Sequence, residues 1–147
     1  RHERFEVQGT GTTASYIHLG GKIGVLAEIG CNDDASLANE QFREMAKDIT
    51  LHIAASKPDY LTREDVPADV TASEREIFAK QAEGKPENIV EKIVDGKIEK
   101  FYATNCLMEQ GFIKDPDQSI TDLLSSCGKE IGDSLSIRRY LLYRIGI

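Results

Sequence analysis

The sequence predicts an α+β fold: a small antiparallel sheet of about three strands, plus an N-terminal strand remnant, with helices on one face and a projecting helical hairpin. Three observations in the 147 residues indicate this class. Short β-rich segments lie near both ends of the chain, and a glycine pair joins two of them. A long segment then repeats apolar residues at steps of three and four. Two further helical segments meet at a Gly-Lys-Pro sequence.

The first strands are predicted from alternation and from turn chemistry. Residues 2–8 alternate between two sets of side chains, which is the period of a half-buried strand. Residues 14–19 and 22–29 flank Gly20-Gly21, and a glycine pair favours the positive φ angles of a tight hairpin turn. The second of these two segments is apolar on both faces at its centre. It is therefore expected to be the central strand.

A long amphipathic helix is predicted after the hairpin. The polar stretch 31–36 can cap its start through Asp34 or Ser36, and Pro58 ends it. Apolar residues recur on one face over about five turns, which is typical of a helix that covers a core. They are Ala38, Phe42, Met45, Ala46, Ile49 and Ile53.

A paired helical arm is predicted over residues 65–105. Asp65 can cap its first helix with Pro67 in the first turn, and Gly84 ends that helix. Pro86 opens the second helix, which carries a wide apolar face. Because the two helices share a short hinge and are long for their core, we expect a hairpin that projects from the sheet.

The C-terminal part predicts a loop, a short helix and a last strand. Residues 115–117 are expected to be loop. Ser119 and Asp122 have the spacing of a capping box, which marks the start of a helix. Residues 135–145 again alternate with period two. This segment is expected to complete the sheet.

The two ends of the chain share a pattern, which bears on domain organisation. Arg1-x3-Phe5-Glu6-Val7 is similar to Arg139-x3-Tyr143-Arg144-Ile145. Such an echo suggests a duplicated subdomain, although five positions can also match by chance. On the first interpretation, residues 1–12 are the end strand and linker of a preceding subdomain. Residues 13–147 are then the core α+β domain, with the arm inside it.

Composition restricts the partners. The chain has 25 acidic and 18 basic residues and a net charge of −7, whereas a phosphate-binding surface needs a basic surplus. Direct nucleic-acid binding is therefore not expected, and a protein partner fits better. No apolar run approaches the ~20 residues that cross a bilayer, and no leader sequence is recognised, so we expect no membrane association and a cytoplasmic location.

No set of residues points to catalysis. The glycines lie in turns without the following helix that would hold a phosphate, and the histidines lack a second metal ligand, so no cofactor or metal is expected. Cys31, Cys106 and Cys127 form no metal motif or disulfide framework and are expected to be buried thiols. A small enzyme using Cys106 or Cys127 is the alternative. Asp33-Asp34 can bind a cation, but helix capping is the simpler role.

Several segments resemble one family in order and spacing. They are Tyr16-Ile17-His18-x3-Lys22-Ile23-Gly24-Val25-Leu26, then 52–61 (His-Ile-Ala-Ala-Ser-Lys-Pro-Asp-Tyr-Leu), then Gly84-Lys85-Pro86 with Ile89-x-Glu91-Lys92-Ile93-x2-Gly96-Lys97, and finally Ile137-Arg138-Arg139-Tyr140-x2-Tyr143. Together they resemble the core domain of elongation factor Ts. The resemblance covers nearly the whole chain.

The resemblance implies a guanine nucleotide exchange factor that docks on the GTPase elongation factor Tu and promotes GDP release, in a bacterial cytoplasm or an organelle matrix. The family's Thr-Asp-Phe-Val motif drives that release, but residues 32–36 here read Asn-Asp-Asp-Ala-Ser. This departure suggests the C-terminal core subdomain of a two-copy member. It also puts in doubt strong exchange activity of this chain alone.

The resemblance further implies a partner-binding hairpin. By position, His18 reaches the β-barrel of the GTPase, and Tyr16, Gly20 and Lys22 surround it. Aromatic and cationic side chains are also the types enriched at binding hot spots. The alternative is an oligomerisation or structural module without exchange activity, because family cores also pair with themselves as homodimers.

Overall fold

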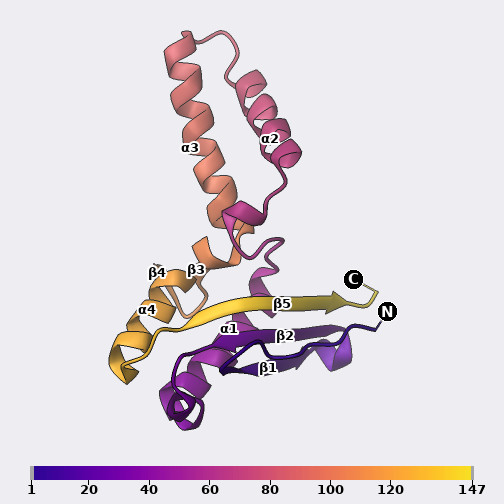
Figure 1. The fold of residues 1–147 in the computed structure, drawn as a ribbon. Coiled ribbons are helices and arrows are strands. Elements are labelled where there is room, and N and C mark those ends of the chain that lie inside the picture. Colours follow the sequence, from indigo (N-terminus) through magenta and orange to yellow (C-terminus); the bar gives the residue numbers. More distant parts are fainter. Residues whose placement is uncertain (1, 147) are drawn as a thin grey trace. The chain divides into compact units, whose positions relative to one another are not determined.

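The structure is a computed structural model that describes residues 2–146 (Figure 1). The chain divides into two compact units. The first combines Arg1–Lys57 with Gly111–Ile147 and holds the main sheet. The second is Pro58–Gln110. None of the helices in residues 2–146 is long and apolar enough to cross a membrane.

The first unit is built on a three-stranded antiparallel sheet. Its strands are β1 (Gly11–His18), β2 (Ile23–Gly30) and β5 (Ser136–Arg144), in the order β1-β2-β5. The predicted small antiparallel sheet is therefore confirmed, and the segment with two apolar faces is the central strand. Gly11 pairs with Gly30, so β1 begins before residue 13, the expected start of the core domain.

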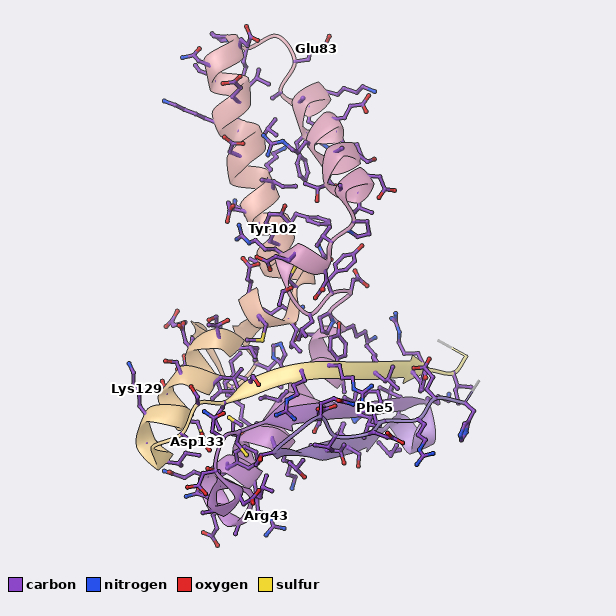
Figure 2. All side chains as sticks on the ribbon, viewed as in Figure 1. Phe5, Arg43, Glu83, Tyr102, Lys129 and Asp133 are labelled. Carbon is purple, nitrogen blue, oxygen red and sulfur yellow. The ribbon has the colours of Figure 1, made fainter. Side chains whose placement is uncertain are left out.

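Residues 2–8 carry no assigned strand, in contrast to the alternation that predicts one. Their polar groups bind side chains of the sheet instead of a neighbouring backbone. The Gln8 N–H donates to a Glu28 carboxylate oxygen at 3.0 Å, and the Glu6 carbonyl accepts from Arg139 at 2.6 Å. The Arg139 guanidinium also lies 4.0 Å from the centre of the Phe5 ring, which is labelled in Figure 2. Side-chain contacts thus hold this segment against the sheet without backbone pairing between strands.

Helix α1 (Glu40–Ser56) covers one face of the sheet and packs against β1 and β2. Its start is capped by Asn39, whose side chain accepts from the backbone N–H groups of Gln41 and Phe42. The expected cap at Asp34 or Ser36 is wrong, because these residues lie within a separate 3₁₀ helix, η2 (Asp34–Ala38), which Asp33 caps. The helix ends before Pro58, as predicted, through Lys57 at φ 48°.

The core lies between α1 and the sheet. Alternate residues of β2 are almost completely buried, and the apolar stripe of α1 is buried with them. On the strand these residues are Ile23, Val25, Ala27 and Ile29, and on the helix Phe42, Met45, Ala46, Ile49 and Ile53. Ala38, the first residue of the predicted stripe, is exposed because it lies in η2 rather than in the helix.

Helix α4 (Ile120–Ile131) packs against α1 in the same unit. Its predicted capping box is confirmed, since Ser119 and Asp122 each accept from the other's backbone N–H. The segment expected to be loop contains a small antiparallel pair instead, β3 (Gly111–Phe112) and β4 (Asp115–Ser119). Pro116 can lie in β4 because the two-stranded pair leaves an edge that needs no N–H donor.

The second unit contains the predicted helical pair, α2 (Ala68–Gln81) and α3 (Glu87–Asn105), which pack against each other. Gly84 has φ +96° between them. Asp65 does not cap α2: it closes a capping box with Thr62 on the 3₁₀ helix η3 (Arg63–Asp65). Pro67 stands at the N-cap of α2 rather than in its first turn, where its missing N–H costs nothing.

Candidate functional site

The candidate site is the hairpin that joins β1 to β2. His18 and Ile23 form the last strand pair, and a 3₁₀ turn, η1 (Leu19–Gly21), lies between them. Leu19, Gly20 and Gly21 all have positive φ angles, of 52°, 62° and 94°. The predicted hairpin is confirmed, but its connection has four residues instead of two. Two of its three left-handed positions carry glycine, which adopts them without steric cost.

The structure brings Tyr16 and His18 together on one face of β1. The Tyr16 hydroxyl lies 2.8 Å from Nδ1 of His18, and the two rings stack with their centres 5.5 Å apart. This arrangement follows from the period of a strand, in which residues two apart point to the same side. A phenol that donates to Nδ1 leaves Nε2 to carry the imidazole proton. The exposed histidine then offers a donor to another molecule.

Gly20 and Lys22 lie in or beside the same turn. Gly20 has open space around its Cα, so it contributes the backbone shape of the turn. Lys22 is exposed, its N–H donates to the Leu19 carbonyl, and its own carbonyl accepts from the Ile145 N–H at 2.8 Å. The four predicted residues therefore share one exposed end of the sheet, although the side-chain contact described above joins only two of them.

An apolar strip lies on the opposite face of the same sheet end. Register places Ile17 across from Gly24 and Gly24 across from Tyr143, while Leu26 pairs with Leu141 in the next row. Ile17 is 67% exposed and Tyr143 36% exposed. Sequence reasoning missed this strip, which we call the open-face strip (Ile17, Leu26, Leu141, Tyr143). A signal for it was present in residues 135–145. Leu141 and Tyr143 are two residues apart, so on a strand these apolar side chains lie on the same face.

A buried carboxylate organises the middle of that face. Glu28 is 0% exposed, and it accepts hydrogen bonds from the Gln8 N–H, from Arg138 at 3.1 Å and from Arg139 at 2.9 Å. Burial raises the pKa of this carboxyl, but the three donors outweigh burial and the pKa is lowered overall. Glu28 therefore stays ionised and fastens the N-terminal segment to the sheet.

A β-bulge explains how two consecutive arginines reach one carboxylate. Glu28 pairs with Arg139 and Ile29 pairs with Ile137, so Arg138 is the extra residue on β5. Its guanidinium lies over two glycines: a Cβ at Gly30 would come within 2.6 Å of it and a Cβ at Gly11 within 2.8 Å. The local sequence thus makes room for this arrangement, which alternation alone does not reveal.

The segment where the family motif is expected is fixed by Asp133, labelled in Figure 2. Its carboxylate accepts from the backbone N–H groups of Asn32 and Asp33 and from the Ser36 hydroxyl. The hydrogen bond from Ser36, together with the backbone donors, lowers the pKa of Asp133 to about 2. Asp33 itself caps η2 by accepting from the Ala35 N–H at 2.9 Å. This loop is therefore held by capping interactions and carries no aromatic side chain.

The three cysteines are buried, as predicted. Burial raises the pKa of the Cys106 thiol to about 11, and it raises the pKa of Cys31 and of Cys127 as well. A nucleophilic cysteine needs the opposite shift, because the thiolate is the reactive form. These surroundings speak against thiol chemistry at Cys106 and Cys127.

Comparison with known proteins identifies the family. The family model described as Elongation factor TS matches residues 1–147. Elongation factor Ts of Geobacter sulfurreducens is 49% identical over 138 residues, which are 92% of this chain and 64% of the relative. That of Moorella thermoacetica is 46% identical over 143 residues, 96% of this chain and 70% of the relative. The chain thus spans about two thirds of the length of these relatives. It belongs to the elongation factor Ts family.

Proposed function

We propose that this chain is the docking domain of a guanine nucleotide exchange factor that acts on elongation factor Tu. The observation that carries the proposal is the Tyr16–His18 pair, held at 2.8 Å on an exposed hairpin of a member of this family. Tyr16 orients the imidazole before binding. Little side-chain freedom is therefore lost when a partner accepts a hydrogen bond from Nε2–H of His18. The backbone shape at Gly20 and the charge of Lys22 complete the contact surface.

The exchange activity follows from linkage. A protein that binds the nucleotide-free GTPase more tightly than the GDP form weakens GDP binding by the same factor. Residues 32–36 have no aromatic side chain that could enter the nucleotide site, and Asp133 ties their backbone down. The hairpin accordingly supplies affinity and orientation for the GTPase. Another domain of the exchange factor supplies the preference for the nucleotide-free form.

The same proposal covers organisation and location. The chain acts as the C-terminal core subdomain, which starts with β1 at Gly11 rather than at residue 13, and the residues before β1 connect it to a preceding copy. The relatives compared above are bacterial proteins, which supports a bacterial cytoplasm as the place of action. Phosphate-dominated recognition of nucleic acid is disfavoured by the net charge of −7.

Isothermal titration of elongation factor Tu tests the hairpin. His18→Ala is expected to weaken binding by about 1–3 kcal/mol, the range of a hot-spot truncation. Tyr16→Phe keeps the stacked ring but removes the hydrogen bond, so it is expected to cost about 0.5–1.5 kcal/mol. His2→Ala, at an exposed histidine outside the hairpin, is the matched control and is expected to bind like the parent. Equal affinities for all four proteins would refute the placement.

A second candidate function is self-association through the open-face strip. Ile17 and Tyr143 expose apolar surface at the end of a sheet face, and such surface is typical of sites that pair with another sheet. Light scattering distinguishes the two functions. If the strip is an oligomer interface, Ile17→Ser lowers the mass of the protein while His18→Ala does not. If docking on the GTPase is the function, His18→Ala weakens binding in the titration and Ile17→Ser does not. The mass of the protein then stays constant in both variants.

A further inference from the structure

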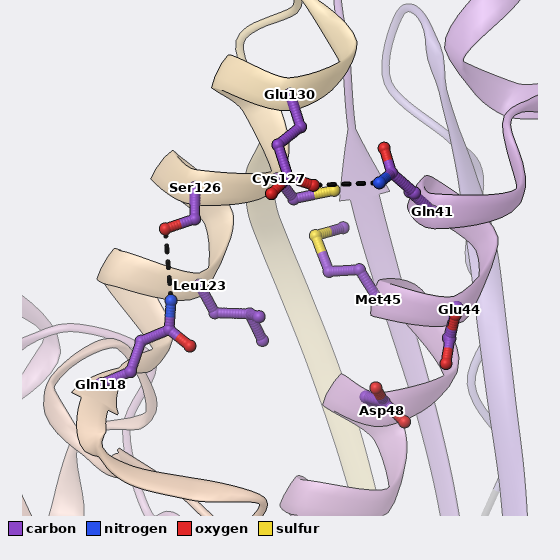
Figure 3. Close-up of a pocket in the computed structure, with 9 residues that line it drawn as sticks. All are labelled: Gln41, Glu44, Met45, Asp48, Gln118, Leu123, Ser126, Cys127 and Glu130. Atoms are coloured by element: carbon purple, nitrogen blue, oxygen red, sulfur yellow. Dashed lines mark hydrogen bonds between the residues drawn. The ribbon is translucent and has the colours of Figure 1, made fainter.

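A groove of about 290 Å³ lies between α1 and α4 of the first unit, away from the hairpin (Figure 3). Each helix lines it with residues at positions i, i+3, i+4 and i+7, so each presents one continuous stripe to it. On α1 these are Gln41, Glu44, Met45 and Asp48, and on α4 Leu123, Ser126, Cys127 and Glu130. The two stripes face each other across the groove, which can receive side chains from a third helix.

The floor of the groove is apolar. Met45 and Cys127 point toward each other from the two helices, and Leu123 reaches in beside them (Figure 3). Met45 is only 4% exposed, so it belongs to the floor and not to the rim. Methionine is adaptable and polarisable, which suits a surface that accepts aliphatic groups of varied shape.

The rim of the groove is acidic. Glu44 and Glu130 stand on opposite helices, and within residues 2–146 neither forms an ion pair with a lysine or arginine. Glu130 accepts a hydrogen bond from Gln41 at 3.0 Å, which fixes its carboxylate at the rim. Asp48 is the third acid, and Lys114 pairs with it at 2.6 Å. Lys114 also interacts electrostatically with Glu44, so one lysine serves two of the three acids and the rim keeps a net negative charge.

We propose that this groove binds a basic amphipathic helix of a protein partner. Lysine and arginine combine an apolar stem with a charged head, so their stems pack on Met45 and Leu123 while their heads reach Glu44 and Glu130. At about 290 Å³ the groove has room for side chains of this length. The acids on both rims select basic residues that recur at three- and four-residue steps.

Fluorescence polarisation with the whole protein tests the proposal. The probe is a fluorescein-labelled, 15-residue helical peptide of leucine and lysine, and a leucine–glutamate peptide of the same pattern is its counterpart. The lysine peptide is expected to bind and the glutamate peptide is not. The double variant Glu44→Gln/Glu130→Gln is expected to weaken binding of the lysine peptide about fivefold to tenfold, and added salt is expected to weaken it further.

Two controls locate the site. Glu83→Gln/Glu91→Gln removes two exposed acids from the second unit and is expected to leave peptide affinity unchanged. Ile17→Ser alters the open-face strip, an exposed apolar surface elsewhere on the first unit, and is also expected to have no effect. Equal losses in both acid double variants would show a general charge effect and overturn the proposal. So would binding of the glutamate peptide, or a protein mass in light scattering that falls only in the Glu44→Gln/Glu130→Gln variant, which would make a second copy the occupant.

Discussion

Replacing Glu28 by glutamine tests the buried ion cluster most sharply. The carboxylate is fully buried and accepts from Gln8, Arg138 and Arg139. Glutamine is nearly the same size, so packing is kept. One oxygen of the side chain becomes an NH₂ donor, however, and this donor must face a group that also donates. The variant therefore removes the charge and at least one hydrogen bond without creating a cavity.

The expected cost follows from these contacts. A hydrogen bond to a charged group contributes about 1.5–3 kcal/mol, and removing one partner of a fully buried ion pair costs about 3–5 kcal/mol. The side chains of Arg138 and Arg139 are 26% and 39% exposed, so water partly replaces the lost acceptor and the lower part of that range applies. We expect a loss of about 3 kcal/mol in the free energy of unfolding. For a chain of this size that is a fall in Tm of about 6–12 °C.

Urea and thermal unfolding measure the loss of stability in Glu28→Gln. Glu91→Gln, at an exposed acid on α3, is the control. Because the folded pKa of Glu28 is lowered from 4.5, its contribution is present above that value and is lost as the pH falls through the folded pKa. The difference between parent and variant should accordingly shrink in acid. Hydrogen exchange at the Gln8 amide should accelerate in the variant. A variant as stable as the parent at pH 7 would refute the assigned role of the cluster.

Three further predictions concern other parts of the chain. Asp133→Asn should destabilise the protein at pH 7 but not near pH 2, because the pKa of Asp133 is lowered from 3.8 to about 2 and its contribution is lost across that interval; urea midpoints at the two pH values measure this. Cys106 should stay unmodified by a thiol reagent at pH 8 until the protein unfolds, since its pKa is about 11; mass spectrometry of labelled peptides would contradict this by finding an adduct on the folded protein. Arg63→Ala should lower the free energy of unfolding by about 1–2 kcal/mol, because the partly exposed Arg63 guanidinium pairs with both Glu99 and Glu109. Amide hydrogen exchange in the C-terminal part of α3 should then become faster. Unchanged exchange would count against a stabilising role for these ion pairs.

Much of the fold could be predicted because local signals and tertiary structure agree. Apolar spacing gave α1 its buried face, the Ser119–Asp122 spacing gave the start of α4, and the glycine pair gave the hairpin. In each case a short-range rule decides the outcome, and nothing distant competes with it. The helical pair of the second unit was predicted for the same reason.

The differences arise where a distant partner decides. The cap of α1 moved to Asn39 because Asp133, about a hundred residues away, binds the loop before it and holds Ser36 inside a 3₁₀ helix. Residues 2–8 form no strand, and two of their backbone groups bind side chains instead: the Gln8 N–H binds Glu28 and the Glu6 carbonyl binds Arg139. Strand β4 was missed because a proline argues against a strand until its edge position is known.

The candidate site divides in the same way. Tyr16 and His18 are two residues apart on a strand, so their common face follows from the sequence. The open-face strip needs the register of β2 with β5, and the cluster of Glu28 needs a bulge at Arg138. Neither the register between two strands nor the position of a bulge is encoded in a local sequence pattern. Both therefore appear only in the structure.

Photo-crosslinking from the hairpin tests the docking proposal most directly. Leu19 is 54% exposed in the turn beside His18, and Ile77, 45% exposed on α2, is the matched position in the second unit. Benzoylphenylalanine is introduced at one or the other in the parent protein, which is then mixed with nucleotide-free elongation factor Tu and irradiated. A hairpin that docks gives an adduct from position 19, and mapping finds it on the GTPase. An adduct from position 77 with none from position 19 would contradict docking through the hairpin.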